Sequence, residues 1–203
     1  MVKVGLTGGA ASGKTTVCEL FREKGVAVSI ADDLARDAVK AGSPGFDAVV
    51  AWFGQGVVSE RGELDRPALR RMLISDTESR RVLESIVQPE VIRLMGAFLE
   101  REEGRGAAMA VCEVPLLFEL DLAGMFDVTL HVGVGHVCQC ARLMARDGVT
   151  QTEAERLLAL QLSDEEKRGR ADLVLDNTRG LSELREGFYK VFEKIIKKSR
   201  GSL

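Results

Sequence analysis

Gly8-Gly9-Ala10-Ala11-Ser12-Gly13-Lys14-Thr15 follows directly on a short apolar run, residues 2–7, at the start of this 203-residue chain. The eight residues match the pattern G-x-x-x-x-G-K-[ST], whose backbone N–H groups surround the phosphates of a nucleotide. Gly8 and Gly13 permit positive φ angles and let the backbone approach the phosphates without a Cβ in the way. A strand before the loop and helical spacing after it are the context that the pattern requires. The stretch therefore predicts a nucleotide-binding domain of the α/β class.

The polar side chains of this loop have separate expected tasks. Lys14 carries a positive charge to the β- and γ-phosphates, and Thr15 offers its hydroxyl to Mg²⁺. The helix that begins near Lys14 directs its positive dipole end at the same phosphates. The residues of this stretch that are predicted to bind ATP are Gly8, Gly9, Ala11, Ser12, Gly13, Lys14, Thr15 and Thr16.

Composition excludes several other classes of protein. A net charge of −3 argues against a basic nucleic-acid surface, and no apolar run is long enough to span a bilayer. The chain enters its first strand without a signal sequence, so a cytoplasmic protein is expected. The four cysteines do not suggest a disulfide framework, and Cys138-x-Cys140 lacks a second Cys or His pair for a metal.

Strand and helix patterns alternate along the chain, which predicts a parallel sheet of five strands flanked by helices. The expected strands are 2–7, 27–30, 107–114, 126–132 and 172–177. The expected helices are 14–24, about 33–41, 44–53, 66–74, 77–103 with an interruption at Pro89, 136–146, 151–166 and 181–198. Asp65 is expected to cap the helix that starts at Arg66-Pro67. The mainly helical block between the second and third strands reads as an insertion beside the sheet.

Acidic residues follow two of the predicted strands, at the edge where parallel sheets bind their ligands. Asp32 could accept a proton from an acceptor hydroxyl, orient Mg²⁺, or simply cap the helix that starts at Asp33. The residues alone do not favour the catalytic or metal-binding interpretation of Asp32 over the interpretation as a helix cap. Glu113 stands where an acid of the Walker B type would hold Mg²⁺ or its waters. Because it is Glu rather than Asp, a water-mediated role is more readily expected.

The segment 136–170 is rich in arginine. Arg142 and Arg146 are four residues apart and share one face of a helix. A helical lid that carries them would close over ATP and exclude water, which a kinase needs in order not to hydrolyse its donor. A single arginine in such a segment is more often part of a surface ion pair, but Arg142, taken with the phosphate loop, is predicted to be functional.

Taken together, these motifs resemble those of the dephospho-CoA kinases. The loop and the buried strand followed by Val114-Pro115-Leu116-Leu117-Phe118-Glu119 carry much of the resemblance. The other matching segments are Ala31-Asp32-x-Leu34-Ala35-Arg36, Gly62-Glu63-Leu64-Asp65-Arg66-x-x-Leu69-Arg70, Leu83-Glu84-x-Ile86-x-x-Pro89, Gln139-x-x-Arg142-Leu143-x-x-Arg146, Gln161 and Ala171-Asp172-x-Val174-x-Asp176-Asn177. They occur in the expected order from Val4 to Asn177, over nearly the whole chain.

The resemblance implies transfer of the γ-phosphate of ATP, with Mg²⁺, to the ribose 3′-hydroxyl of dephospho-CoA. It implies a P-loop nucleotide-binding core (1–32, 106–141 and 171–203), a helical acceptor subdomain (33–105) and a lid (142–170). Asp32 would then be the base on the 3′-hydroxyl, with Lys14 and Arg142 as the other catalytic residues. Thr15 and Glu113 would hold the metal. Arg142 and Asn177 would bind ATP, and the loop after Asn177 would border the adenine. A monomer without nucleic-acid or membrane partners is expected.

Two positions depart from the family pattern, which commonly has Asp where this chain has Ile30 and His where it has Gln88. An amide does not titrate near neutral pH, so Gln88 has no acid–base role. Another small-molecule or nucleotide kinase, and an ATP-binding regulatory module, are the alternatives. A GTPase is excluded because no Asn-Lys-x-Asp segment is present. The arginines available for the acceptor's phosphates are Arg66, Arg70, Arg80 and Arg81.

Overall fold

A computed structural model describes residues 1–200, without the side chains at positions 70, 74, 75, 77, 199 and 200. The side chain of Arg70, one of the arginines considered for the acceptor's phosphates, therefore lies outside the described residues. The chain divides into two compact units, residues 1–28 with 101–203, and residues 29–100. Within the described part of the chain, no helix has both the length and the apolar character needed to cross a membrane.

Five strands form one sheet in the order β2-β3-β1-β4-β5. They are β1 (Val2–Thr7), β2 (Ala27–Ile30), β3 (Met109–Glu113), β4 (Val128–Gly133) and β5 (Leu173–Asp176). β1 pairs in parallel with β3 and with β4, and β4 pairs in parallel with β5. β3 and β4 are buried along their whole length, as strands covered on both faces are. The predicted five-stranded parallel sheet flanked by helices is confirmed.

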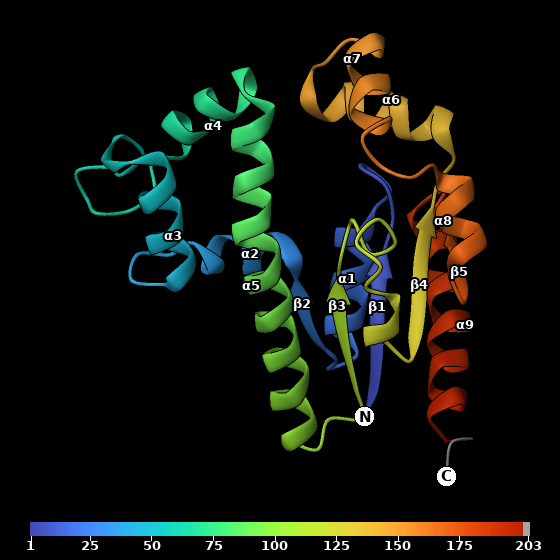
Figure 1. Ribbon diagram of the computed structural model, residues 1–203. Helices are drawn as coiled ribbons and strands as arrows, with labels where there is room; N and C mark the ends of the chain where they lie inside the picture. The colour runs from blue at the N-terminus through green and yellow to red at the C-terminus, as the bar shows by residue number, and fades with distance from the viewer. Residues whose placement is uncertain (201–203) are drawn as a thin grey trace. The chain divides into compact units, whose positions relative to one another are not determined.

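Two helices of the first unit, α1 (Lys14–Glu23) and α9 (Leu181–Arg200), pack together on the sheet (Figure 1). Phe21 of α1 and Phe188 of α9 meet edge to face with ring centroids 4.9 Å apart, in a core that includes Leu6, Leu130 and Leu175. Such aromatic pairs stabilise by about 0.5–1.5 kcal/mol beyond the burial of their area. This core holds in place the carboxyl end of β1, from which the phosphate loop begins.

Three further helices of the first unit follow β4. They are α6 (His136–Asp147), α7 (Gln151–Leu158) and α8 (Asp164–Arg170). α6 and α7 lie beyond the carboxyl end of β4, and α8 returns along that strand (Figure 1). The short 3₁₀ helix η2 (Ala123–Met125) precedes β4. The single helix expected over 151–166 is therefore wrong: Ser163 and Glu166 form a capping box, which starts a new helix at Asp164.

The second unit is helical. It contains α2 (Ala31–Ala38), α3 (Pro44–Phe53), the 3₁₀ helix η1 (Gln55–Val57), α4 (Arg66–Ser75) and most of α5 (Thr77–Gly104). Val49, Val57 and Leu69 form a small core of their own. Asp65 caps α4 as predicted, since its carboxylate accepts a hydrogen bond from the N–H of Ala68.

α5 runs unbroken through Pro89, so the expected interruption at that proline is wrong. A proline inside a helix removes one N–H, here the donor to the Ser85 carbonyl, and its ring crowds that carbonyl, at a cost of about 3 kcal/mol. The other interactions of this 28-residue helix outweigh that cost, since the helix continues on both sides of Pro89. The other differences lie at element ends: α2 begins at Ala31 rather than Asp33, and β3 is confined to Met109–Glu113.

Candidate functional site

The phosphate loop connects β1 to α1 at the carboxyl edge of the sheet. α1 begins at Lys14, as predicted, after Gly13, whose φ of 97° lies in the left-handed region. Ala11 also has a positive φ, 56°, whereas Gly8 does not use the positive φ that glycine permits. Gly8 is needed for close approach instead. A Cβ there would lie 2.6 Å from the Ser12 hydroxyl and 2.7 Å from the Val132 carbonyl oxygen.

Gly8→Ala is expected to weaken ATP binding and to lower stability, because the added methyl group meets backbone as well as a side chain. Overpacking of this kind typically costs about 1–3 kcal/mol. Thermal melting and titration calorimetry with ATP measure the two effects. Gly124→Ala is the matched control, since nothing described lies within 4 Å of a Cβ at that position. Equal melting temperatures and equal ATP affinities for the two variants would contradict this account of the loop.

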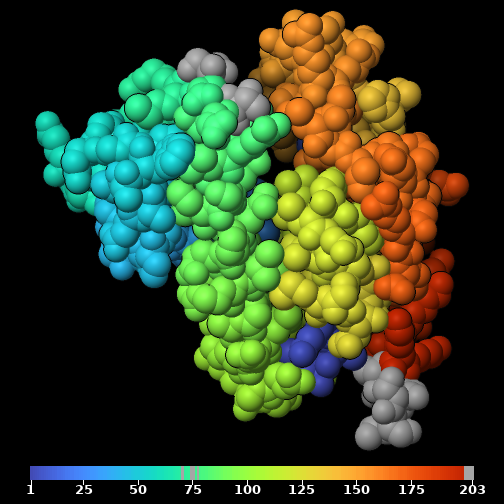
Figure 2. All heavy atoms as spheres, in the orientation of Figure 1, coloured from blue at the N-terminus to red at the C-terminus, as the bar shows by residue number. Residues whose placement is uncertain are grey.

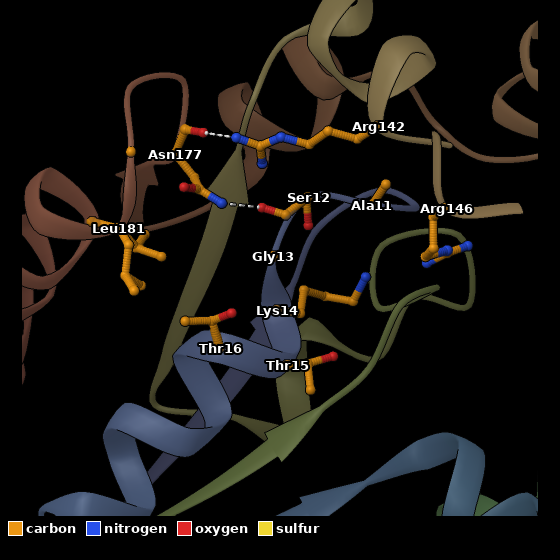
Figure 3. A pocket seen from close by; sticks show the side chains of 12 residues that line it. Ala11, Ser12, Gly13, Lys14, Thr15, Thr16, Arg142, Arg146, Asn177 and Leu181 are labelled. Atoms are coloured by element: carbon orange, nitrogen blue, oxygen red, sulfur yellow. Dashed lines mark hydrogen bonds between the residues drawn. The ribbon is translucent and has the colours of Figure 1, made fainter. Parts of the chain in front are cut away.

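A cavity of about 460 Å³ adjoins the loop (Figure 3). The predicted ATP-binding residues that line it are Ala11, Ser12, Gly13, Lys14, Thr15, Thr16, Arg142 and Asn177. Its remaining lining residues, which were not predicted as ATP ligands, are Arg146, Gly180, Leu181 and Leu184. Gly9 lines a second, smaller cavity of about 260 Å³ instead. The phosphate loop, α6 and the turn after β5 thus meet around one cavity.

Asn177 joins the loop to the arginine of α6. Its side-chain Nδ2 donates to the Ser12 carbonyl at 2.7 Å, and its own carbonyl accepts from Arg142 Nη2 at 2.8 Å (Figure 3). The side chain is buried against the loop, and a Cβ on Gly13 would lie 2.3 Å from Nδ2. Asn177 therefore positions both Ser12 and Arg142 at the cavity.

Lys14 connects the loop to the acid at the end of β3. Its ammonium donates to the carbonyl oxygens of Gly8 and Gly9, at 2.8 and 3.0 Å. The same nitrogen lies 3.7 Å from Glu113 Oε1, and the Glu113 carboxylate is almost fully buried. Opposite charges at this separation attract strongly where water is scarce. The structure thus brings the lysine and the predicted metal-binding acid together.

The loop has features that fit a phosphate ligand. Ser12 Oγ is buried and makes no hydrogen bond with any residue that the structure describes. An unpaired buried hydroxyl costs about 1–3 kcal/mol. That cost would be recovered if the hydroxyl donated a hydrogen bond to a phosphate oxygen. Ser12 and Lys14 also line the same cavity. These observations fit the triphosphate of a nucleotide.

The donors available for Mg²⁺ are few. In the described part of the chain, no three His, Cys, Asp or Glu side chains gather where they could hold a metal ion. Mg²⁺ at phosphotransfer sites usually takes one or two protein oxygens and completes its shell with phosphates and water. The exposed hydroxyl of Thr15 and the carboxylate of Glu113 fit that pattern.

Packing of α6 and α7 against the phosphate loop was not predicted. Gln139 of α6 is buried and donates through Nε2 to the Ala10 carbonyl at 3.2 Å. The side chains of Ala10 and Ala11 pack on an apolar cluster of α6 and α7: Cys140, Leu143, Ala154 and Leu158. The segment Gln139-x-x-Arg142, quoted for the family resemblance, contained the signal that could have identified Gln139.

Arg146 also lines the cavity, although only its place beside Arg142 on one helix face was predicted. Its guanidinium donates two hydrogen bonds to the carboxylate of the next residue, at 2.7 and 2.8 Å. These bonds hold the pKa of Asp147 below its usual range. Arg146 is thus occupied by a surface partner, whereas Arg142 is fixed on the loop side.

Asp32 lies in the second compact unit, as the second residue of α2. Its side chain is exposed. α2 begins at Ala31, its N-cap is Ile30, and no side chain caps it. The reading of Asp32 as a helix cap is therefore wrong. The nearby Arg36 pairs with Asp33, at 2.6 Å. Asp32 thus sits in the first turn, two residues past the carboxyl end of β2.

Comparisons with known proteins agree on one family. The sequence model of dephospho-CoA kinase matches residues 2–183. A dephospho-CoA kinase of Arabidopsis thaliana is 39% identical over 194 residues, which cover 95% of this chain and 83% of the plant protein. A dephospho-CoA kinase of Halalkalibacterium halodurans is 41% identical over 175 residues, 86% of this chain and 87% of the bacterial one. A Thermus thermophilus protein known by its crystal structure has a TM-score of 0.78 and 37% identity, covering 95% of this chain and 97% of its own. The matches run through both compact units.

Proposed function

This chain belongs to the dephospho-CoA kinase family, and we propose that Lys14, Asp32 and Arg142 carry its transfer of the γ-phosphate of ATP to the ribose 3′-hydroxyl of dephospho-CoA. The observation that supports the roles of Lys14 and Arg142 most directly is the cavity beside the loop, which all the predicted ATP-binding residues except Gly8 and Gly9 line. The role of Asp32 rests on the family resemblance. Arg142 and Asn177, far from the loop in sequence, reach that cavity from α6 and from the end of β5.

The residues divide the work as follows. The loop amides and Lys14 bind the phosphates, and the ammonium offsets the negative charge that spreads over the transferring group. Thr15 and Glu113 would hold Mg²⁺, Glu113 directly or through water, and the ion supplies further charge neutralisation on the phosphates. Asp32 accepts the proton of the 3′-hydroxyl. Residues 142–170 act as the lid that excludes water, and residues 33–105 bind the acceptor.

Arg142→Ala is expected to lower kcat with little change in stability. Arg142 Nη2 donates to the Asn177 carbonyl at 2.8 Å, so its guanidinium is held at the cavity before any ligand binds. A hydrogen bond to a charged group contributes about 1.5–3 kcal/mol, which corresponds to a tenfold to hundredfold loss of rate. Steady-state kinetics beside thermal melting measure both quantities.

The matched control for Arg142 is Arg156→Ala, which removes an exposed arginine from α7 of the same proposed lid. That variant is expected to keep its turnover. If Arg142→Ala were as active as Arg156→Ala, Arg142 would have no part in the transfer.

A product assay tests the proposed function as a whole. Purified protein is incubated with ATP, Mg²⁺ and dephospho-CoA, and CoA and ADP are separated chromatographically. We expect CoA and ADP in equal amounts, and no ADP when Mg²⁺ is chelated. Phosphorylation of nucleosides or nucleotides in preference to dephospho-CoA would point to another small-molecule kinase, and ATP binding without transfer to a regulatory module. The proposal includes a monomer in the cytoplasm, and sizing chromatography measures the oligomeric state.

A further inference from the structure

Lys167 of α8 is a lysine with no exposed side-chain surface. Its ammonium lies 2.8 Å from Glu119 Oε1 and donates to the Pro115 carbonyl oxygen at 2.7 Å. Removing a charged pair from water costs several kcal/mol per ion, and an apolar pair of similar volume often serves stability as well or better. Stability alone therefore does not account for an ion pair at this place.

The pair joins the end of β1 to the segment after β3. The Pro115 carbonyl accepts from Lys167 and also from the hydroxyl of Thr7, at 3.3 Å. Thr7 is the last residue of β1 and directly precedes the phosphate loop. Pro115 follows two residues after Glu113, whose carboxylate lies 3.7 Å from the Lys14 ammonium. The bonds to Pro115 thus fix the backbone on which Glu113 stands.

The same pair fixes the place where the proposed lid returns to the sheet. Glu119 Oε1 accepts a second hydrogen bond, from the N–H of Leu162 at 2.9 Å, in the connection between α7 and α8. In Figure 2 the segment after β3 (yellow) and α8 (orange) lie against each other on one face. Two residues after Leu162, Asp164 accepts from the N–H groups of Val134 and Gly135, which precede α6, at 3.2 and 3.3 Å.

We propose that Lys167 and Glu119 are positioning residues for phosphoryl transfer. They hold Glu113, and the connection between α7 and α8 in the proposed lid, in fixed positions relative to the phosphate loop. The inference rests on the proposed function, because it concerns the same reaction. Neither residue lines the ATP cavity, so both act through the backbone of Pro115 and Leu162. Small misplacements of catalytic groups slow a reaction by up to about a hundredfold without abolishing binding.

Lys167→Met is the first test. We expect kcat to fall by about tenfold to a hundredfold, while the Kd for ATP measured without acceptor stays close to that of the unaltered protein. The Mg²⁺ concentration for half-maximal rate is expected to rise, since Glu113 loses its fixed position. Lys190→Met, at an exposed lysine of α9, is the matched control and is expected to leave all three quantities unchanged.

The double variant Lys167→Met/Glu119→Leu separates positioning from stability. Removing both charges avoids the cost of one unpaired buried ion, so its Tm is expected to exceed that of Lys167→Met. Its kcat is expected to stay low, because the Pro115 carbonyl still lacks the hydrogen bond from Lys167 and the Leu162 N–H has now lost its acceptor as well. The double variant alone decides the matter if Lys167→Met is too unstable to purify.

Unchanged kcat in the single variant, or recovery of kcat together with Tm in the double variant, would overturn the positioning role. A failure of the proposed function is distinguishable from either result, because the unaltered protein itself would then make no CoA.

Discussion

Lys14→Ala is expected to lose most of its ability to bind ATP and nearly all transfer. The Lys14 ammonium donates hydrogen bonds to the carbonyl oxygens of Gly8 and Gly9 and lies 3.7 Å from Glu113 Oε1. The substitution therefore removes the positive charge that contacts both the phosphate loop and Glu113. Removing a single preorganised donor at the developing charge of a transition state costs about 10²–10³ in kcat. Because Lys14 also binds the phosphates in the ground state, KM for ATP is expected to rise at the same time.

Calorimetry with ATP and steady-state kinetics measure the two losses, and thermal melting shows whether the fold persists. Lys190→Ala serves as the control for the loss of one positive charge, since this lysine is exposed on α9. Unaltered ATP affinity and unaltered rate in Lys14→Ala would refute the account of the loop as a phosphate cradle.

Asp32→Asn is expected to fold and to bind ATP normally, and to lose most of its turnover. General-base catalysis contributes about 10²–10⁴ to a rate, and an amide cannot accept the proton. The substitution keeps the size of an exposed side chain that caps no helix, so little stability is at stake. Kinetics with saturating ATP and dephospho-CoA, beside calorimetry with ATP alone, separate turnover from binding.

The neighbouring carboxylate provides the control for Asp32. Asp33→Asn removes a charge from the next position of the same helical turn and breaks an exposed pair with Arg36. Exposed pairs contribute about 0–1 kcal/mol, so this variant is expected to keep both its stability and its turnover. Full turnover in Asp32→Asn would mean that another group accepts the hydroxyl proton.

Local patterns predicted the fold well because each of them depends on neighbours in sequence. The strand–loop–helix order around Lys14 and the cap at Asp65 are short-range features, and the structure has them where they were expected. Helix ends were less well predicted. The start of α8 was missed although Ser163 and Glu166 carry a capping-box pattern, because periodicity through residue 166 was followed instead.

The site was predictable only in part, since several of its contacts join distant segments. The loop residues came from one contiguous motif, and Arg142 and Asn177 came with the help of the family resemblance. The contact of Lys167 with Pro115 spans 52 positions, and nothing in the local sequence distinguishes this lysine from an exposed one. Only the folded chain shows that Lys167 is buried and paired rather than exposed.

The positive φ of Ala11 links the shape of the phosphate loop to the packing of α6 and α7. A left-handed alanine costs roughly 1–3 kcal/mol, and glycine would avoid that cost. A glycine would lack the methyl group that packs, together with Ala10, on the apolar cluster of Cys140, Leu143, Ala154 and Leu158. Substitutions within that cluster are therefore expected to shift the backbone of the loop and to change the affinity for ATP, although none of the four residues lines the ATP cavity.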